Sequence, residues 1–114
     1  KVGKDVRYAV EVLKQIVAHG AGIVLFTMRS GQYLEEAINW FTERGIPLYG
    51  INKNPTQSNW TQSPKAYAHL YIDDAALGCP LTFDETICSR PFVDWVGVDK
   101  LLQEHHWYIE PIVA

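Results

Sequence analysis

Long apolar runs are missing from this sequence, and so is any excess of positive charge. No stretch reaches the roughly 18 consecutive apolar residues of a membrane-spanning helix, and the first residues lack the basic and apolar regions of a signal peptide. Lys and Arg number 10 against 13 Asp and Glu, which gives a formal net charge of -3. Such a chain has no positive field with which to hold a nucleic-acid backbone or an anionic membrane. We therefore expect neither among its partners.

Cysteine is also scarce. The chain has two cysteines, Cys79 and Cys88, whose spacing fits no metal-binding or redox motif, and two are too few for a disulfide scaffold. Ordinary reduced thiols are the simpler interpretation, and they predict a cytoplasmic protein. The two side chains could still meet in the fold, and the sequence leaves that open.

Helical and strand patterns alternate along a chain whose length and composition predict one domain over residues 1–114. Three segments carry apolar residues at helical spacing: 6–17, 32–44 and 98–106. Three apolar runs predict buried strands: 23–26, 46–51 and 69–72. Gly20 and Gly45 would end the first two helices, and Ser63-Pro64 predicts a short helix over 63–68. We therefore expect an α/β fold, a three-layer Rossmann-like parallel sheet with helices on both faces.

Polar side chains follow the predicted strands, where ligands bind in open α/β sheets. They are Thr27, Asn52 and the adjacent pair Asp73 and Asp74. Two carboxylates at the end of a buried strand repel each other, and a hard divalent cation offsets this repulsion. The pair therefore predicts a Mg²⁺ site, and a solvated acidic turn is the simpler alternative.

Residues that suit a phosphate surround this predicted site. The Thr27 hydroxyl could donate to a phosphate oxygen, and the backbone N–H groups of Met28 and Arg29 precede a predicted helix N-terminus. Lys65 lies eight positions before Asp73 and could bring an ammonium group to the same crevice. A Thr that caps a helix and a solvated Lys are the structural alternatives. Together these groups predict phosphoryl transfer, which mainly requires positioning and charge neutralisation.

The order of these residues resembles a known family. The succession Ile23 to Thr27, then Lys65, then Leu70 to Asp74 is similar to motifs two, three and four of the haloacid dehalogenase-like hydrolase superfamily. The resemblance covers roughly residues 6–80 and is greatest for small, minimally capped phosphatase-like members. It implies a Mg²⁺-dependent hydrolase of a small phosphomonoester that acts through an aspartyl-phosphate. By this resemblance, Thr27 binds the phosphoryl group, Lys65 stabilises the phosphorylated intermediate, and Asp73 with Asp74 holds Mg²⁺.

The first motif of that family, an Asp-x-Asp that supplies the nucleophile and the general acid, does not occur in these 114 residues. Because the chain begins with Lys1 on what would be the first helix, we expect the nucleophile strand to precede it, outside these residues. The 114 residues alone would then be inactive. The alternative is a non-catalytic binding or interaction module, whose open sheet a second copy of the chain or another partner would complete.

Two other patterns bear on function. A phospho-receiver domain also combines acidic residues, a Thr and a Lys, but its acidic pair comes early and its Lys last, opposite to the order here. The tryptophans favour packing roles, since basic residues are not interleaved with them. Trp60 is the exception, because its polar loop over 52–61 could cover the crevice as a lid. Nothing in that loop distinguishes a sugar phosphate, a nucleotide and a phosphoprotein as substrate.

Overall fold

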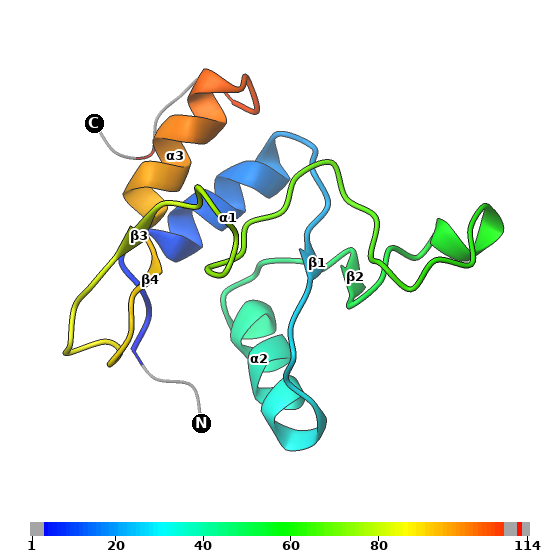
Figure 1. Ribbon diagram of the computed structural model, residues 1–114, viewed down its shortest axis with the longest axis horizontal. Helices are drawn as coiled ribbons and strands as arrows, with labels where there is room; N and C mark the ends of the chain where they lie inside the picture. The colour runs from blue at the N-terminus through cyan, green and yellow to red at the C-terminus, as the bar shows by residue number, and fades with distance from the viewer. Residues whose placement is uncertain (1–3, 109–111, 113–114) are drawn as a thin grey trace. The chain divides into compact units, whose positions relative to one another are not determined.

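The computed structural model describes residues 4–108 and 112 (Figure 1). Its helices are α1 (Ala9–Ala18), α2 (Gly31–Glu43) and α3 (Trp95–Glu104), with one 3-10 turn, η1 (Gln57–Asn59). Its strands are β1 (Val24–Leu25), β2 (Gly50–Ile51), β3 (Leu81–Thr82) and β4 (Phe92–Val93). The described residues divide into two compact units. The first unit is Ala21–Tyr71, and the second joins 4–20 to 72–108 and 112.

Strands β1 and β2 of the first unit pair in parallel, with α2 between them in the sequence (Figure 1). Leu25 lies opposite Ile51. Backbone bonds of 2.7 Å continue the pairing at both ends, from the Tyr49 N–H to the Ile23 carbonyl and from the Asn52 N–H to the Leu25 carbonyl. The carboxyl ends of both strands are therefore held together.

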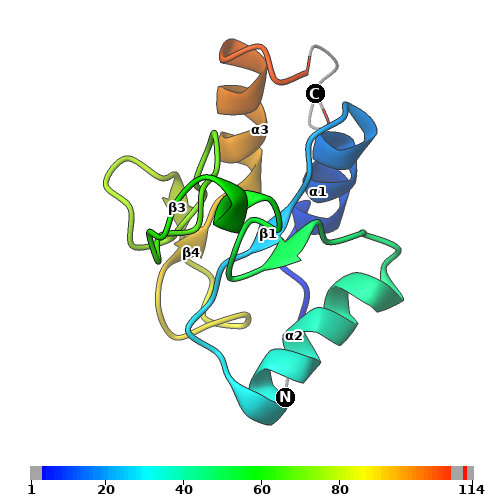
Figure 2. The ribbon, with the colours of Figure 1, turned by 90° about the vertical axis from the view of Figure 1, so that its right-hand side faces the viewer.

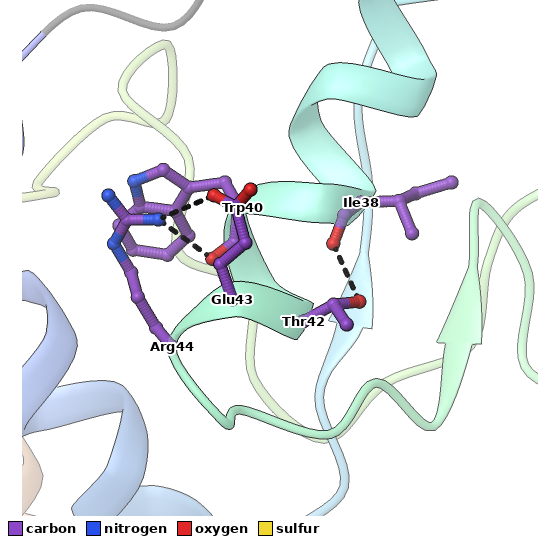
Figure 3. Close-up of polar contacts among 5 residues, drawn as sticks. All are labelled: Ile38, Trp40, Thr42, Glu43 and Arg44. Carbon is purple, nitrogen blue, oxygen red and sulfur yellow. Dashed lines mark hydrogen bonds and ion pairs between the residues drawn. The ribbon is translucent and has the colours of Figure 1, made fainter.

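Arg44 caps the C-terminal end of α2 (Figure 3). Its Nη1 donates to the Trp40 carbonyl oxygen at 3.0 Å and lies 3.7 Å from Glu43 Oε1. Its guanidinium carbon lies 4.4 Å from the centroid of the Trp40 ring. A cation is favourable here, because the last carbonyls of a helix have no partner within the helix and carry partial negative charge. Gly45 follows with φ at 69°, which confirms it as the predicted end of the helix.

The core of the second unit lies between α1 and α3, which pack side by side (Figure 2). Val12 of α1 meets Val98 and Leu102 of α3, and Tyr108 completes this buried cluster. Half-buried apolar side chains pack against it: Ile16, Ile72, Val93, Trp95, Trp107 and Ile112. Burying such side chains is worth roughly 1.5–3 kcal/mol each, so this cluster is the main source of stability in the second unit.

Asp99 is a buried acid on the inner side of α3, with no exposed surface. Its Oδ1 accepts hydrogen bonds from the Tyr108 hydroxyl at 2.6 Å and from the Ile112 N–H at 3.2 Å. Its Oδ2 accepts one from Gln103 Nε2 at 3.1 Å. The carboxyl group therefore ties the segment after α3 to the helix itself.

Burial raises the pKa of Tyr108 far above its ordinary value of 10.0, and the hydrogen bond to Asp99 adds to the rise. The neutral phenol is thus favoured in the folded state, so its stabilising effect is complete below about pH 10 and is lost as the pH rises further. We expect the free energy of unfolding to fall above about pH 10, and to fall less steeply in Tyr108→Phe. Urea titrations at pH 8 to 11 measure both curves, and parallel curves would contradict the prediction.

Three predicted helices are confirmed, with small shifts of their ends: α1, α2 and α3 cover most of 6–17, 32–44 and 98–106. The first two predicted strands are present but shorter, as β1 and β2. The hairpin of β3 and β4 falls in 81–95, a stretch without a clear sequence pattern. Among the described residues, no helix combines the length and the apolar character needed to cross a membrane.

The prediction of a three-layer Rossmann-like parallel sheet is wrong. Over residues 4–108 and 112 the strands form two separate sheets of two strands each, β1 with β2 in parallel and β3 with β4 antiparallel. The predicted third strand, 69–72, is irregular, and the boundary between the two units falls after Tyr71. Leu70 and Tyr71 are 43% and 40% exposed, whereas a central strand would bury both.

The predicted helix over 63–68 is also absent (Figure 2). A helix needs the Tyr67 N–H to donate to the Ser63 carbonyl. Instead, the Tyr67 N–H donates to Gln57 Oε1 at 2.8 Å, and the Ser63 carbonyl accepts from Gln57 Nε2 at 3.1 Å. A buried side chain has therefore taken the backbone groups that the helix would have used.

Candidate functional site

Thr27 lies just beyond β1 and is held by the end of β2. Its backbone N–H donates to Asn52 Oδ1 at 2.8 Å. Asn52 has φ at 60°, in the left-handed region that Asn tolerates better than most residues. A Cβ at Gly50 would collide with the Lys53 carbonyl oxygen, so the turn after β2 requires glycine there. This tight turn aims the Asn52 amide at Thr27 and fixes the two strand ends relative to each other.

The Thr27 hydroxyl shapes the start of the next loop. Its Oγ1 accepts a hydrogen bond from the Arg29 backbone N–H at 3.1 Å, so that N–H is not directed at a ligand. The Arg29 side chain donates from Nη1 to the Tyr33 carbonyl oxygen at 3.1 Å, and Met28 is 99% exposed. Because Oγ1 acts as acceptor in this contact, the Thr27 hydroxyl proton remains able to donate to a phosphate oxygen.

Lys65 lies on the irregular segment that Gln57 organises. Gln57 is 7% exposed, and its Nε2 donates to the carbonyl oxygens of Ser63 and Lys65 at 3.1 and 2.5 Å. Its Oε1 accepts from the Tyr67 N–H at 2.8 Å. Three bonds from one buried amide fix the backbone on both sides of Lys65, whose own side chain is exposed.

Asn54 connects this segment to the end of β2. Its Nδ2 donates to the Tyr67 carbonyl oxygen at 3.4 Å, and its Oδ1 accepts from the N–H and the hydroxyl of Thr56 at 3.0 and 2.9 Å. Asn52, two residues earlier, holds Thr27. Within the first unit, two asparagines that lie two positions apart thus make separate contacts, Asn52 with the backbone at Thr27 and Asn54 with the segment that carries Lys65.

The Lys65 ammonium lies over an aromatic ring. Its Nζ is 5.4 Å from the centroid of Tyr71, a cation–π contact. The Tyr71 hydroxyl donates to the carbonyl oxygen of Ala66, which is itself 3% exposed. The ring is therefore anchored beside Lys65, where it restricts the positions of the ammonium group.

Asp73 and Asp74 belong to the second unit, where both are exposed. Asp73 Oδ1 accepts from the Ala75 N–H at 2.9 Å, which is the acidic turn expected as the simpler alternative. Burial raises the pKa of the Cys79 thiol, and the charges of Asp73 and Asp74 raise it further. Cys79 and Cys88 are both free thiols.

The predicted site residues are therefore divided between the units. Thr27, with Met28 and Arg29, and Lys65 lie in the first, and the two aspartates lie in the second. In the part of the chain that the structure describes, no group of three or more His, Cys, Asp or Glu side chains could hold a metal ion. Sequence reasoning missed Gln57, because a glutamine in a polar loop gives no sign that it is buried.

Comparisons with known proteins add a structural likeness. No family model matches the chain, and no curated protein matches it. A solved structure from Bacteroides thetaiotaomicron, described as that of a conserved protein coded by locus, has 27% sequence identity and a TM-score of 0.72. The match covers 100% of this chain and 84% of that chain. The description of that protein states no activity, so the likeness concerns the fold.

Proposed function

We propose that this chain carries the phosphate-binding part of a Mg²⁺-dependent, haloacid dehalogenase-like phosphohydrolase that acts on a small phosphomonoester. The observation that carries the proposal is the set of side-chain contacts to the backbone in the first unit. Asn52 fixes Thr27 at the joined ends of two parallel strands, and Asn54 and Gln57 fix the segment of Lys65. β1 and β2 run in parallel, and Thr27 and Asn52 lie just beyond their carboxyl ends.

In this proposal, Thr27 and Lys65 bind the phosphoryl group. The Thr27 hydroxyl donates to a phosphoryl oxygen while its Oγ1 still accepts the hydrogen bond from the Arg29 N–H. The Lys65 ammonium supplies positive charge, which is worth most at the transition state, when negative charge is spread over the phosphoryl oxygens. The attacking Asp of an aspartyl-phosphate mechanism is not among these 114 residues, so the proposal requires it from outside them.

Asp73 and Asp74 supply carboxylate oxygens, the ligand type that Mg²⁺ takes in proteins. One oxygen of Asp73 already accepts the Ala75 N–H, which orients the carboxylate and leaves its second oxygen for a ligand. When bound, Mg²⁺ would offset the mutual repulsion of the two carboxylates. We place this activity in the cytoplasm, where free thiols such as Cys79 and Cys88 persist.

Replacing Lys65 by Ala should weaken the binding of inorganic phosphate about tenfold, because the ammonium charge is lost while the Gln57 contacts, which use backbone atoms, remain. Thr27→Val should weaken it about threefold through loss of the donor. Isothermal titration calorimetry measures both. Lys14→Ala is the control, since Lys14 is an exposed lysine of the second unit, outside the segment of Lys65, and the phosphate affinity of this variant should stay unchanged. Equal affinities in the wild type and both variants would contradict these roles.

Asp73→Asn and Asp74→Asn should each raise the Mg²⁺ concentration needed for half-maximal binding by about tenfold, because each removes one anionic ligand. Asp84→Asn is the control: Asp84 is another exposed acid of the second unit, with a carboxylate oxygen that accepts from Thr86. Mg²⁺ titrations followed by calorimetry compare the three variants. Unchanged titrations for Asp73→Asn and Asp74→Asn would remove both residues from the site.

The alternative function is a non-catalytic binding module, which the missing Asp-x-Asp favours. The full-length protein, assayed with Mg²⁺ and a set of small phosphomonoesters, distinguishes the two functions. Release of phosphate that EDTA abolishes supports the hydrolase. Phosphate binding without release, together with a dimer in solution, supports a module completed by a second copy of the chain. Absence of both release and Mg²⁺ binding would overturn the hydrolase.

A further inference from the structure

Three ring side chains gather on the same irregular segment as Lys65. The Trp60 and Tyr67 rings meet edge to face, with centroids 5.2 Å apart and planes at 90°. Tyr67 and His69 meet in the same way, at 5.3 Å and 72°. Trp60 is 59% exposed and Tyr67 40%, so much of their ring surface faces solvent. We call Trp60, Tyr67 and His69 the aromatic cluster.

The aromatic cluster is held in place by the backbone beneath it. Tyr67 donates its N–H to Gln57 and accepts from Asn54 at its carbonyl, so both backbone groups of the central residue are fixed. Trp60 follows η1 directly, and its N–H donates to the Gln57 carbonyl at 3.1 Å. A ring surface that is ordered before a ligand arrives loses little entropy on binding.

Gln57 also joins the aromatic cluster to the proposed phosphate site. Its Oε1 accepts from the Tyr67 N–H of the cluster, and its Nε2 donates to the Lys65 carbonyl oxygen, two residues away. Charge points the same way. Residues 52–71 contain Lys53 and Lys65 and no Asp or Glu, in a chain whose net charge is -3. This segment is therefore the part of the chain that suits an anion with a flat, apolar face.

We propose that the aromatic cluster binds the base of a nucleoside monophosphate, whose phosphate is taken by Lys65 and Thr27. The inference rests on the proposed function and names the substrate class for the same site. Exposed Trp and Tyr rings stack on nucleobases, and each such contact changes affinity by roughly five- to more than a hundredfold in other proteins. Two rings at right angles offer one face for stacking and one edge beside it.

A base fits this surface better than a sugar ring does. A sugar phosphate is recognised by hydrogen bonds to its hydroxyls, which require polar side chains that are free to make them. The two amides beside the cluster are engaged with the protein: Gln57 bonds Ser63, Lys65 and Tyr67, and Asn54 bonds Thr56 and Tyr67. Beside these engaged amides, the rings of Trp60 and Tyr67 and the Lys65 side chain are exposed to solvent.

The test compares adenosine 5′-monophosphate, ribose 5-phosphate and inorganic phosphate, each titrated against the 114-residue chain by calorimetry. We expect the nucleotide to bind about tenfold more tightly than ribose 5-phosphate, and Trp60→Ala to remove that difference. Trp60→Phe should restore most of this difference in affinity, because Phe again supplies a ring face for stacking. Tyr33→Ala is the control, since Tyr33 is a 64% exposed aromatic residue of the same unit, outside the cluster. Circular dichroism establishes that each variant is folded.

The outcomes separate this inference from the proposed function. Equal affinities for the nucleotide and ribose 5-phosphate, both weakened about tenfold in Lys65→Ala, would overturn the base site and support the phosphate site. Tighter binding of the nucleotide that Trp60→Ala does not change would also overturn the role of the cluster. Absence of binding by all three ligands would overturn both proposals. A preference for the nucleotide that disappears in Trp60→Ala and returns in Trp60→Phe supports the inference.

Discussion

Asp99→Ala is expected to lower the free energy of unfolding by about 3 kcal/mol, a large loss for the removal of a single polar side chain. Asp99 is fully buried, and its carboxylate accepts from the Tyr108 hydroxyl, the Ile112 N–H and Gln103 Nε2. Truncation leaves the Tyr108 hydroxyl and the Ile112 N–H without this acceptor, while Gln103 Nε2 keeps its bond to the Asp99 carbonyl oxygen. Each buried donor left unpaired costs roughly 1–3 kcal/mol.

The measurement is urea denaturation followed by tryptophan fluorescence, because Trp95 and Trp107 pack against the core that Asp99 braces. Asp99→Asn is the matched control. Its carbonyl oxygen can still accept from Tyr108, so we expect a loss of about 1 kcal/mol. Equal losses for the Ala and Asn variants would contradict the argument, since they would show that the charge, and not the acceptor, stabilises the fold.

Local patterns in the sequence predicted α1, α2 and α3 well, because each depends on residues a few positions apart, whereas the predicted helix over 63–68 lost its backbone groups to Gln57. Of the apolar residues at helical spacing in 6–17, Ala9 is buried, whereas Val12, which is fully buried against α3, lies outside that spacing. Gly45 adopts the positive φ that ends α2. Such signals are local, so tertiary context had little opportunity to override them.

The sheet was predicted incorrectly because its third strand depended on a partner that the sequence does not specify. An apolar run such as His69 to Ile72 is compatible with a strand, but it becomes one only if neighbouring backbone supplies the ladder. Here Ile72 packs into the core of the second unit, while Leu70 and Tyr71 remain exposed. Short apolar runs identify candidate strands, and pairing decides which of them form.

The sequence predicted some of the site residues and missed others. Asn52 was predicted at a strand end, and the structure shows that its Oδ1 accepts a hydrogen bond from the Thr27 N–H. Asp73 was predicted as a metal ligand or a solvated turn, and its bond to Ala75 forms the turn. Gln57 gave no signal at all, because burial of a polar side chain follows from which backbone groups surround it.

Gln57 is the residue whose replacement is expected to have the second large effect. Gln57→Ala should weaken inorganic phosphate binding about tenfold and lower the free energy of unfolding by about 2 kcal/mol, although Gln57 has no role in touching the ligand. Its amide is the common partner of Ser63, Lys65 and Tyr67. Without it, the segment of Lys65 loses its fixed backbone, and the ammonium must be ordered again each time a phosphate binds.

Hydrogen exchange gives Gln57 a readout separate from ligand binding. The Tyr67 N–H is protected by Gln57 Oε1, so its exchange should accelerate at least about tenfold in Gln57→Ala, with or without phosphate. Gln62→Ala is the matched control, because Gln62 is exposed on the same segment and should change neither exchange nor affinity. Weaker phosphate binding with unchanged Tyr67 exchange would mean that Gln57 acts on the ligand directly. Faster exchange with unchanged binding would mean that Lys65 does not depend on the order of its segment, and the positioning role would fail.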